Sequence, residues 1–375
     1  MKIVLCSSYF NHHQMPLSDA LSRVTEGNYR YIATRTISEE RKAIGYGREK
    51  QPDYVMDYTD DSIQSKCVAQ IDSADVIVAG TCPQNLIQNQ FSSGKLIFRY
   101  SERPLKNGIE PLKYIPRYIK WHRNNPSKAN IYMLCASAYT ASDYAKFGLF
   151  KNRSYKWGYF PKTVYYDDFD GLMGAKDRTR ILWCGRFLDL KHPDDAIEVA
   201  RLLKNEGYDF SLDFIGTGPM ESTIKAMIID YGLENCVHVL GVKPPEEVRS
   251  YMEKAGIFLF TSDKREGWGA VLNEAMNSGC AVVGAKDIGA VPFLVKDGEN
   301  GLTYNCGRID ELYKCTKALL DSVEEQKRLG RFAYQTIAEE WNADVAAERL
   351  KHLAATIMGG QESPDLYKSG PCSKV

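Results

Sequence analysis

The sequence has no net charge and no long apolar run. Lysine plus arginine equal aspartate plus glutamate, at 48 each, so the composition gives no reason to expect a nucleic-acid partner. No uncharged apolar run approaches the roughly 18 residues that a membrane-spanning helix needs. The segment Met1–Ser8 has too few apolar residues for the core of a secretion signal. We therefore expect a cytoplasmic protein that is not integral to a membrane.

The sequence also lacks any Cys-x-x-Cys pair, although it contains ten cysteines. Four of them lie in or beside apolar runs: Cys6, Cys135, Cys184 and Cys280. A thiol in such a run behaves as a small core hydrophobe. We therefore predict reduced, buried thiols in a reducing compartment rather than disulfides or a zinc site.

Short apolar runs alternate with segments of helical period along the 375 residues. Most runs are apolar at successive positions, which is typical of parallel strands covered on both faces. The strands predicted in the first half are Lys2–Ser7, Tyr29–Ala33, Tyr54–Asp57, Asp75–Ala79, Lys95–Tyr100 and Ile131–Ala136. Those in the second half are Thr179–Cys184, Ser211–Ile215, Val237–Leu240, Ile257–Thr261 and Ala281–Gly284. Two such series predict an α/β protein with two Rossmann-like, doubly wound domains that face each other across a cleft.

The predicted boundary lies in the stretch 155–178, which has neither a helix nor a strand period. We place an N-terminal domain at 1–160 and a C-terminal domain at 161–340. A C-terminal helix is predicted over 341–358, and its apolar residues suit packing back onto the first domain. The segment 359–375 is rich in Gly, Ser and Pro, which predicts a disordered tail.

Ligands in such sheets bind beyond the carboxyl ends of the strands, so functional residues are expected in the loops there. Arg186 and Lys191 could clamp phosphate oxygens, although ordinary solvated charges would look the same. Gly216 and Gly218 allow a close backbone approach to an anion, but the third glycine of a dinucleotide fingerprint is absent. The loop that contains Val242 could hold a flat base through its backbone, although a plain turn is the simpler reading.

A fourth loop has more residues that could bind a ligand. Gly267 and Gly269 precede a run of good helix formers, so free backbone N–H groups are expected beside a ligand. Glu266 and Glu274 flank this loop, and carboxylates accept hydrogen bonds from sugar hydroxyls. The alternative is one acidic residue at a helix N-terminus and one exposed helical glutamate.

Together the four loops resemble glycosyltransferase family 4, whose members are retaining enzymes with the B-type glycosyltransferase (GT-B) fold. Glu266 and Glu274 match the family's E-x7-E motif, within Glu-Gly-Trp-Gly and Asn-Glu-Ala-Met. Gly185-Arg186-Phe187 with Lys191, and Gly216-Thr217-Gly218-Pro219, fall in the family's order and spacing. The resemblance runs from about Thr179 to Leu302. It implies that the domain at 161–340 binds the nucleotide sugar and that the domain at 1–160 lies on the acceptor side.

The resemblance implies that Arg186 and Lys191 neutralise the donor diphosphate in place of a metal ion, so no metal or other cofactor is expected. Glu274 would bind the donor ribose, and Glu266 would contact the donor sugar and stabilise charge at its anomeric carbon. The predicted donor site also includes the residues around these side chains: Gly185, Gly216, Gly218, Val242, Gly267, Trp268, Gly269 and Ala270.

The first half departs from the family pattern. The loop after its first strand, Tyr9–Gln14, is bulky where the family is glycine-rich, and Tyr100–Arg103 lacks the histidine that many members have. The Gly-Gly-x-Pro-Glu turn appears as Gly289–Phe293, without its acid. First-domain catalytic residues therefore do not carry over, and position alone suggests Glu102 as a base or electrostatic partner. His12 and His13 are candidates for acceptor or phosphate contact, or simply part of an exposed loop.

A basic and aromatic stretch spans residues 99–130, where eight Lys or Arg residues face two Glu residues. It suits an anionic membrane surface or a phosphorylated lipid acceptor, but equally an ordinary amphipathic helix with solvated charges. Pro116 is expected to bend or break a helix there. Asp168-Phe169-Asp170 matches the metal-binding DxD of A-type glycosyltransferases, but it does not follow a predicted strand, so we expect no metal there.

The sequence thus predicts a glycosyltransferase of polysaccharide biosynthesis that moves a hexose-type sugar from a nucleotide diphosphate, UDP before other bases. The expected acceptor is a glycan or glycolipid precursor, with peripheral contact at the inner membrane face as an option. The alternatives are a nucleotide-sugar epimerase of the same fold and a nucleotide-sugar-binding module without turnover. A dehydrogenase is disfavoured by the incomplete glycine fingerprint.

Overall fold

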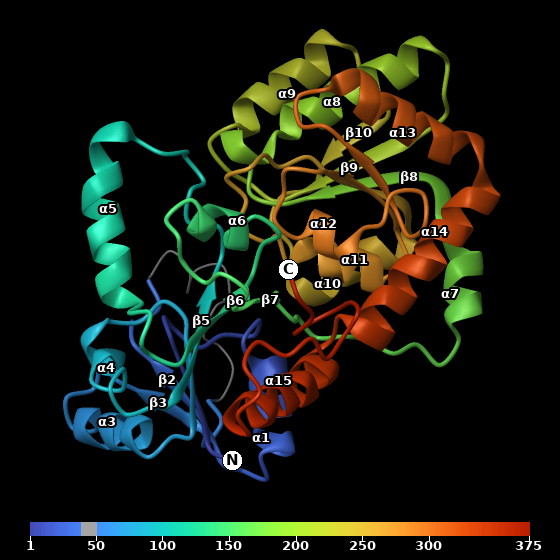
Figure 1. Cartoon of the computed structure of the whole chain (residues 1–375). Helices are drawn as coiled ribbons and strands as arrows, with labels where there is room; N and C mark the ends of the chain where they lie inside the picture. The colour runs from blue at the N-terminus through green and yellow to red at the C-terminus, as the bar shows by residue number, and fades with distance from the viewer. Residues whose placement is uncertain (39–50) are drawn as a thin grey trace. The chain divides into compact units, whose positions relative to one another are not determined.

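The computed structural model describes residues 1–38 and 51–375 (Figure 1). The chain folds into two compact units. Unit 1 comprises Met1–Lys162 together with Trp341–Val375, and unit 2 comprises Thr163–Glu340. The boundary falls within the stretch 155–178 that lacks a regular period in the sequence.

Unit 1 is built on a seven-stranded parallel sheet in the order β3-β2-β1-β4-β5-β6-β7. Its strands are β1 (Ile3–Ser7), β2 (Tyr29–Ala33), β3 (Val55–Asp57), β4 (Val76–Ala79), β5 (Leu96–Ser101), β6 (Ile131–Cys135) and β7 (Ser154–Lys156). Its helices are α1 (Met15–Val24), α3 (Gln64–Asp72), α4 (Asn85–Gln88), α5 (Pro111–Asn124), α6 (Thr140–Ala145) and α15 (Ala343–Met358). Every residue of β4 and β6 is buried, as the unbroken apolar runs predict.

Unit 2 is built on a six-stranded parallel sheet in the order β10-β9-β8-β11-β12-β13. Its strands are β8 (Asp177–Cys184), β9 (Ser211–Ile215), β10 (Val237–Val239), β11 (Ala255–Phe260), β12 (Ala281–Ala285) and β13 (Leu302–Tyr304). Its helices are α7 (Phe169–Ala175), α8 (Pro193–Asn205), α9 (Glu221–Asp230), α10 (Pro245–Lys254), α11 (Val271–Asn277), α12 (Val291–Leu294), α13 (Ile309–Asp321) and α14 (Val323–Gln335), with single turns at Asp189–Lys191 and Thr336–Glu340. The strand order reverses between β8 and β11, which is where ligands bind in doubly wound sheets.

The C-terminal helix α15 packs on α1 within unit 1. The Asn342 side chain accepts a hydrogen bond from the backbone N–H of Val345 and so caps the helix. Arg23 forms an ion pair with Asp344 at 2.7 Å, and Lys351 donates to the carbonyl of Val24 at 2.7 Å. Residues far apart in sequence therefore complete one domain.

The prediction of a disordered tail at 359–375 is wrong. The tail pairs with the edge strand β7: the Cys372 N–H donates to the Lys156 carbonyl, and the Lys156 N–H donates to the Ser373 carbonyl, each at 2.8 Å. Cys372 and Ser373 are buried. An edge strand offers unpaired backbone groups, and the tail satisfies them despite its loop-like composition.

Two further predictions concern the cysteines and Pro116. All ten cysteines are free thiols, and Cys6, Cys135 and Cys280 are buried, as predicted, while Cys184 is partly exposed. Of the bend or break expected at Pro116, the break does not occur, since α5 is continuous through this residue. Pro116 is exposed, so the carbonyl of Leu112, which loses its helical partner, can reach solvent.

Candidate active site

The loops after β8 and β9 are joined backbone to backbone. The Gly185 N–H donates to the Ile215 carbonyl at 3.0 Å, and the Phe187 N–H donates to the Thr217 carbonyl at 2.9 Å. Gly216 has a φ of +135°, and a Cβ there would lie 1.9 Å from the Gly185 carbonyl oxygen. The glycines of this loop are thus required by the contact between two loops, a reason that the sequence alone could not distinguish from ligand approach.

Gly218 and Val242 extend the same edge of the sheet. A Cβ on Gly218 would lie 2.6 Å from the Phe187 carbonyl oxygen. The Gly216 N–H donates to the Gly241 carbonyl at 2.9 Å, which fixes the loop after β10. Val242, beside it, is 56% exposed. The structure therefore brings these predicted donor residues together beyond the carboxyl ends of β8, β9 and β10.

Lys191 and Glu266 form an ion pair. Lys191 lies in the loop after β8 and Glu266 in the loop after β11, so the pair spans the position at which the strand order reverses. Both side chains are largely buried, and Ser262 donates a second hydrogen bond to Glu266 at 3.1 Å. Arg186 is exposed, and none of the described residues forms an ion pair with its guanidinium. Within the described residues, the charge of Lys191 is thus neutralised by Glu266, while Arg186 forms no ion pair.

A second network, which the sequence reading missed, fastens these two loops. Arg265 pairs with Asp263 and with Asp189, both at 2.6 Å. Burial opposes ionisation of Asp263, but hydrogen bonds from Arg265 and His192 outweigh it and lower its pKa. Among the backbone contacts, the Asp263 N–H donates to the Leu190 carbonyl at 2.9 Å. The network holds Lys191 and Glu266 in register from both sides of the switch point.

Glu274 lies in α11, the helix that follows the loop after β11. Burial raises its pKa, and the positive charge of Arg249 offsets part of this effect. Burial also raises the pKa of Cys184, the last residue of β8, to about 12, with the charge of Glu274 adding to the shift. Glu274 is therefore close to the end of β8.

The loop Gly267–Ala270 is partly structural. The Trp268 ring is fully buried, and its Nε1 donates to Asn273 at 2.9 Å, so the ring belongs to the core and only the backbone of this residue is placed to meet a ligand. Gly269 has a φ of +87°, and a Cβ there would lie 2.2 Å from the ring of Phe260. Gly267 is buried and Ala270 is half-buried.

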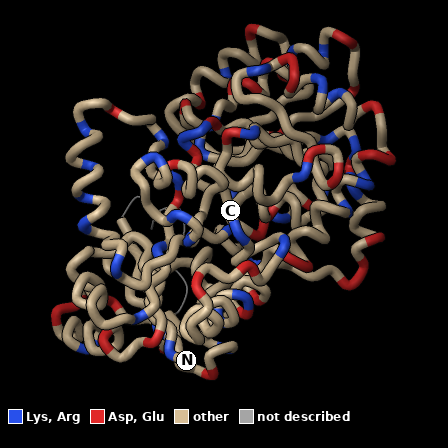
Figure 2. Tube along the Cα trace, in the orientation of Figure 1, with Lys and Arg blue, Asp and Glu red and all other residues tan. Residues whose placement is uncertain are grey.

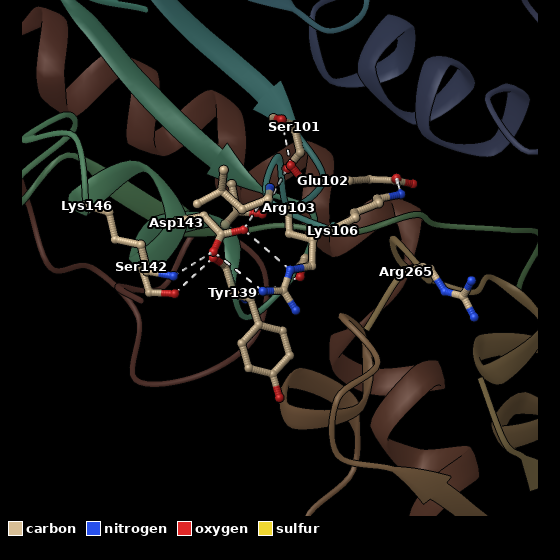
Figure 3. A network of polar contacts seen from close by, with 12 residues as sticks. Ser101, Glu102, Arg103, Lys106, Tyr139, Ser142, Asp143, Lys146 and Arg265 are labelled. Atoms are coloured by element: carbon tan, nitrogen blue, oxygen red, sulfur yellow. Dashed lines mark hydrogen bonds and ion pairs between the residues drawn. The ribbon is translucent and has the colours of Figure 1, made fainter. Parts of the chain in front are cut away.

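Glu102 belongs to unit 1, where Figure 3 shows it beside a network centred on Asp143. Lys106 pairs with Glu102 at 2.5 Å, and the Tyr159 hydroxyl donates to it at 2.6 Å. The fully buried Asp143 pairs with Arg103 at 3.4 Å and accepts the Leu105 N–H at 3.1 Å. Glu102 is thus held by two donors at the carboxyl end of β5, and Asp143 orients the neighbouring arginine.

The rings of His12 and His13 lie 4.0 Å apart, centroid to centroid, after β1. Burial, together with the charge of His12, lowers the pKa of His13 to about 4. His13 is therefore neutral near pH 7, which suits a hydrogen-bonding role better than a phosphate-binding one.

Two clusters of side chains have the residue types that could bind a metal ion. In the Asp168-Phe169-Asp170 segment, Asp168 caps α7 and Asp170 pairs with Arg331, so both acids have structural roles. In unit 2, ligand atoms of His192, Asp194 and Asp195 lie within 4.8 Å of one another, a spacing that could hold a cation. His192 also contacts Asp263 at 3.3 Å, which ties this group to the loop network.

Comparison with known proteins identifies a matching family, similar sequences and a similar fold. Residues 169–336 match the family described as "Glycosyl transferases group 1". The amylovoran biosynthesis glycosyltransferase AmsK of Erwinia amylovora is 38% identical over 127 residues, which cover 32% of this chain and 31% of that protein. A putative colanic acid biosynthesis glycosyltransferase, WcaL of Salmonella typhimurium, is 30% identical over 43% of this chain and 41% of its own. The matched stretches thus span less than half of these relatives.

Two solved structures cover nearly the whole chain. Anabaena Alr3699/HepE, determined in complex with UDP, has a TM-score of 0.69 at 14% identity and covers 95% of this chain and 100% of its own. The apo lipopolysaccharide outer core galactosyltransferase WaaB has a TM-score of 0.67 at 17% identity and covers 96% of this chain and 100% of its own. The two parallel sheets therefore have the two-domain GT-B fold. Residues 169–336, which carry the donor-site candidates from Gly185 to Glu274, are a group 1 glycosyltransferase domain.

Among residues 1–38 and 51–375, no helix has both the length and the apolar character needed to cross a bilayer.

Proposed function

We propose that the protein transfers a hexose-type sugar from a nucleoside diphosphate sugar to a glycan or glycolipid precursor. The observation that carries the proposal is the meeting of Lys191 and Glu266 at the switch point of a group 1 glycosyltransferase domain, with Arg186 and Glu274 on the same edge. Two cations and two carboxylates there match the needs of a diphosphate, a sugar and a ribose. Unit 1 would supply the acceptor side, with Glu102 as the candidate base or electrostatic partner.

In this proposal Arg186 and Lys191 bind the donor diphosphate and stabilise the charge that develops on it as the glycosidic bond breaks. Glu266 contacts the donor sugar and stabilises positive charge at the anomeric carbon, with retention of configuration. Glu274 accepts hydrogen bonds from the ribose hydroxyls. Since the two cations carry the charge on the leaving group, the reaction is expected to need no metal ion.

The choice of UDP and of polysaccharide biosynthesis draws support from similar proteins. Solved structures with this fold are described as complexes with UDP and with UDP-glucose. The relatives named above are described as glycosyltransferases of amylovoran and colanic acid biosynthesis. The ten free thiols support a reducing, cytoplasmic location. The predicted contact with an anionic membrane concerns a different surface and is a separate proposal.

The first test is thermal unfolding of the purified chain with UDP, GDP, ADP or NAD in the presence of EDTA. A ligand at about 100 times its dissociation constant stabilises the native state by about 2.7 kcal/mol, which a melting curve detects. Stabilisation by UDP that Glu274→Ala abolishes would support the donor site. Stabilisation by NAD alone, or by UDP only when a divalent cation is added, would contradict the proposal.

The second test separates the competing activities. UDP-sugars are incubated with and without lipid-linked or oligosaccharide acceptors in EDTA, and the products are resolved by mass spectrometry. Sugar transfer that requires the acceptor supports the proposal. Conversion of the donor alone to an isomeric UDP-sugar would indicate an epimerase, and UDP binding without any conversion would indicate a binding module.

A further inference from the structure

Helix α5 is joined to the rest of unit 1 along one edge only. All of Pro111–Asn124 lies in the described part of the chain, and none of its residues is buried. Tyr114 stacks on Phe147 with ring centroids 4.8 Å apart, and Trp121 packs on Tyr144 at 4.8 Å and on Phe147 at 4.6 Å. Tyr114 and Trp121 therefore face the small core cluster around Leu105 and Phe147.

The opposite edge of α5 is aliphatic and exposed. Leu112 is 94% exposed, Ile115 69% and Ile119 61%. Their spacing of three and four residues places them on one face, so they form a continuous apolar stripe. A monomer in water gains nothing from presenting such a stripe, and an apolar patch rimmed by polar groups marks an interaction site.

The stripe is bordered by positive charge. Lys113, Arg117, Lys120 and Arg123 belong to α5, and the helix itself contains no acidic residue (Figure 2). Glu110, just before the helix, pairs with Lys113 at 2.7 Å. Within the described residues, Lys120 and Arg123 form no ion pair or hydrogen bond, so their charges are available to a partner.

We propose that α5 is a membrane-docking helix that binds the surface of an anionic bilayer. Leu112, Ile115 and Ile119 enter the boundary between headgroups and acyl chains, and the basic residues contact lipid phosphates. The packed aromatic edge keeps the helix in place, so its exposed face is already ordered before binding. Neither the stripe nor the charges belong to the candidate donor site, so the inference does not rest on the proposed function.

A lipid surface fits this face better than a second copy of the chain. Two copies joined through their α5 stripes would bring two sets of four like charges together, and these charges would repel each other. Anionic lipids would instead attract them. Three aliphatic side chains also bury far less accessible surface than the roughly 800 Å² that each partner buries in a stable protein interface. A planar, anionic and apolar layer requires neither shape complementarity nor a large area.

The proposal is tested by flotation of the full chain with vesicles of phosphatidylcholine alone and of phosphatidylcholine mixed with phosphatidylglycerol. The variant Leu112→Ser/Ile115→Ser/Ile119→Ser removes the stripe, and Lys120→Gln/Arg123→Gln removes the free charges. The matched controls are Ile229→Ser, which is 64% exposed on α9, and Lys296→Gln/Lys314→Gln, whose side chains are 70% and 75% exposed. Circular dichroism and melting curves establish that every variant is folded.

We expect binding to the anionic vesicles and little to neutral ones, with weakening at raised salt. Loss of the stripe should lower the partition coefficient at least about ten-fold. Loss of both charges should lower it roughly 25-fold, about five-fold for each. The controls should bind as the unchanged protein does. The proposal is overturned if folded protein stays off anionic vesicles, if the stripe variant binds equally well, or if sedimentation shows a dimer that the stripe variant dissociates.

Discussion

Lys191 and Glu266 neutralise each other across the two loops that flank the switch point of the second sheet. A diphosphate that enters this site competes with Glu266 for the lysine. Glu266→Gln is therefore expected to leave Lys191 without its counter-charge, to destabilise the ligand-free protein and to tighten the binding of UDP. Calorimetric titration with UDP and melting curves with and without it would measure both effects.

The same substitution should nevertheless lower turnover. If Glu266 stabilises charge at the anomeric carbon, its loss costs about 100-fold to 1,000-fold in kcat. Glu299→Gln, which breaks an exposed pair with Lys296, is the control and should change neither UDP binding nor kcat. Weaker UDP binding by Glu266→Gln would contradict the competition between carboxylate and diphosphate.

Glu274 should trade stability for donor binding. Burial raises its pKa, so the folded state holds the proton more tightly than the unfolded state does. The carboxylate therefore costs stability once the pH exceeds the unfolded pKa, and the cost grows until the folded pKa is passed. Glu274→Gln, which cannot ionise, is expected to be more stable than the unchanged protein near pH 7, with the difference vanishing near pH 4.

The expected functional cost of Glu274→Gln is a roughly ten-fold to 100-fold loss of UDP affinity, because a hydrogen bond to a charged acceptor is replaced by a neutral one. Chemical denaturation at several pH values and UDP titration give the two readouts. Glu234→Gln, at an exposed position, should leave both unchanged. A lower stability of Glu274→Gln near pH 7 would show that the carboxylate is not destabilising.

Gly216 is expected to tolerate no side chain. An alanine Cβ would lie 1.9 Å from the Gly185 carbonyl oxygen at a φ of +135°, so Gly216→Ala should force the two loops apart and cost several kcal/mol of unfolding free energy. Gly174 in α7 has open space at its Cβ, and Gly174→Ala should stabilise by about 0.5–1 kcal/mol. Urea denaturation compares the two; similar values would refute the close approach.

His13 should make the protein sensitive to acid. Its pKa is lowered from 6.5 to about 4, first by burial and then by the charge of His12. The unfolded state therefore binds the proton at a higher pH than the folded state, and stability falls as the pH drops from about 6.5 towards 4. His13→Gln should remove about 2–3 kcal/mol of this loss. Denaturation profiles that stay parallel for both proteins over that range would exclude His13 as the cause.

The sequence located the strands well because burial on both faces leaves a simple signal. β11, for example, is apolar and buried at all six positions. The three-residue edge strands β7 and β13 were not predicted, although β3 and β10, which are equally short and also lie at sheet edges, were. The tail was misread because its partner is the backbone of β7, which the composition of the tail itself does not indicate.

The relative positions of the candidate site residues could also be predicted in part. Lys191, Glu266 and Glu274 stand in motifs of fixed order, so their placement on one edge followed from the sheet topology. The Arg265–Asp189 contact joins residues 76 positions apart and belongs to no motif, so it required the three-dimensional structure. For α5 the sequence left two readings open, a membrane-facing helix and an ordinary packed helix, because the periodicity predicts an apolar face but not which side of the helix packs on the core.

The pairing of residues 341–375 with unit 1 also sets an order of assembly on the ribosome. Unit 2 is contiguous, so residues 163–340 can fold as soon as they emerge. Unit 1 begins earlier in the chain but stays unfinished until α15 and the segment around Cys372 have been synthesised. The half of the protein made first is therefore completed last, and its sheet edge at β7 stays uncovered throughout translation of the other half.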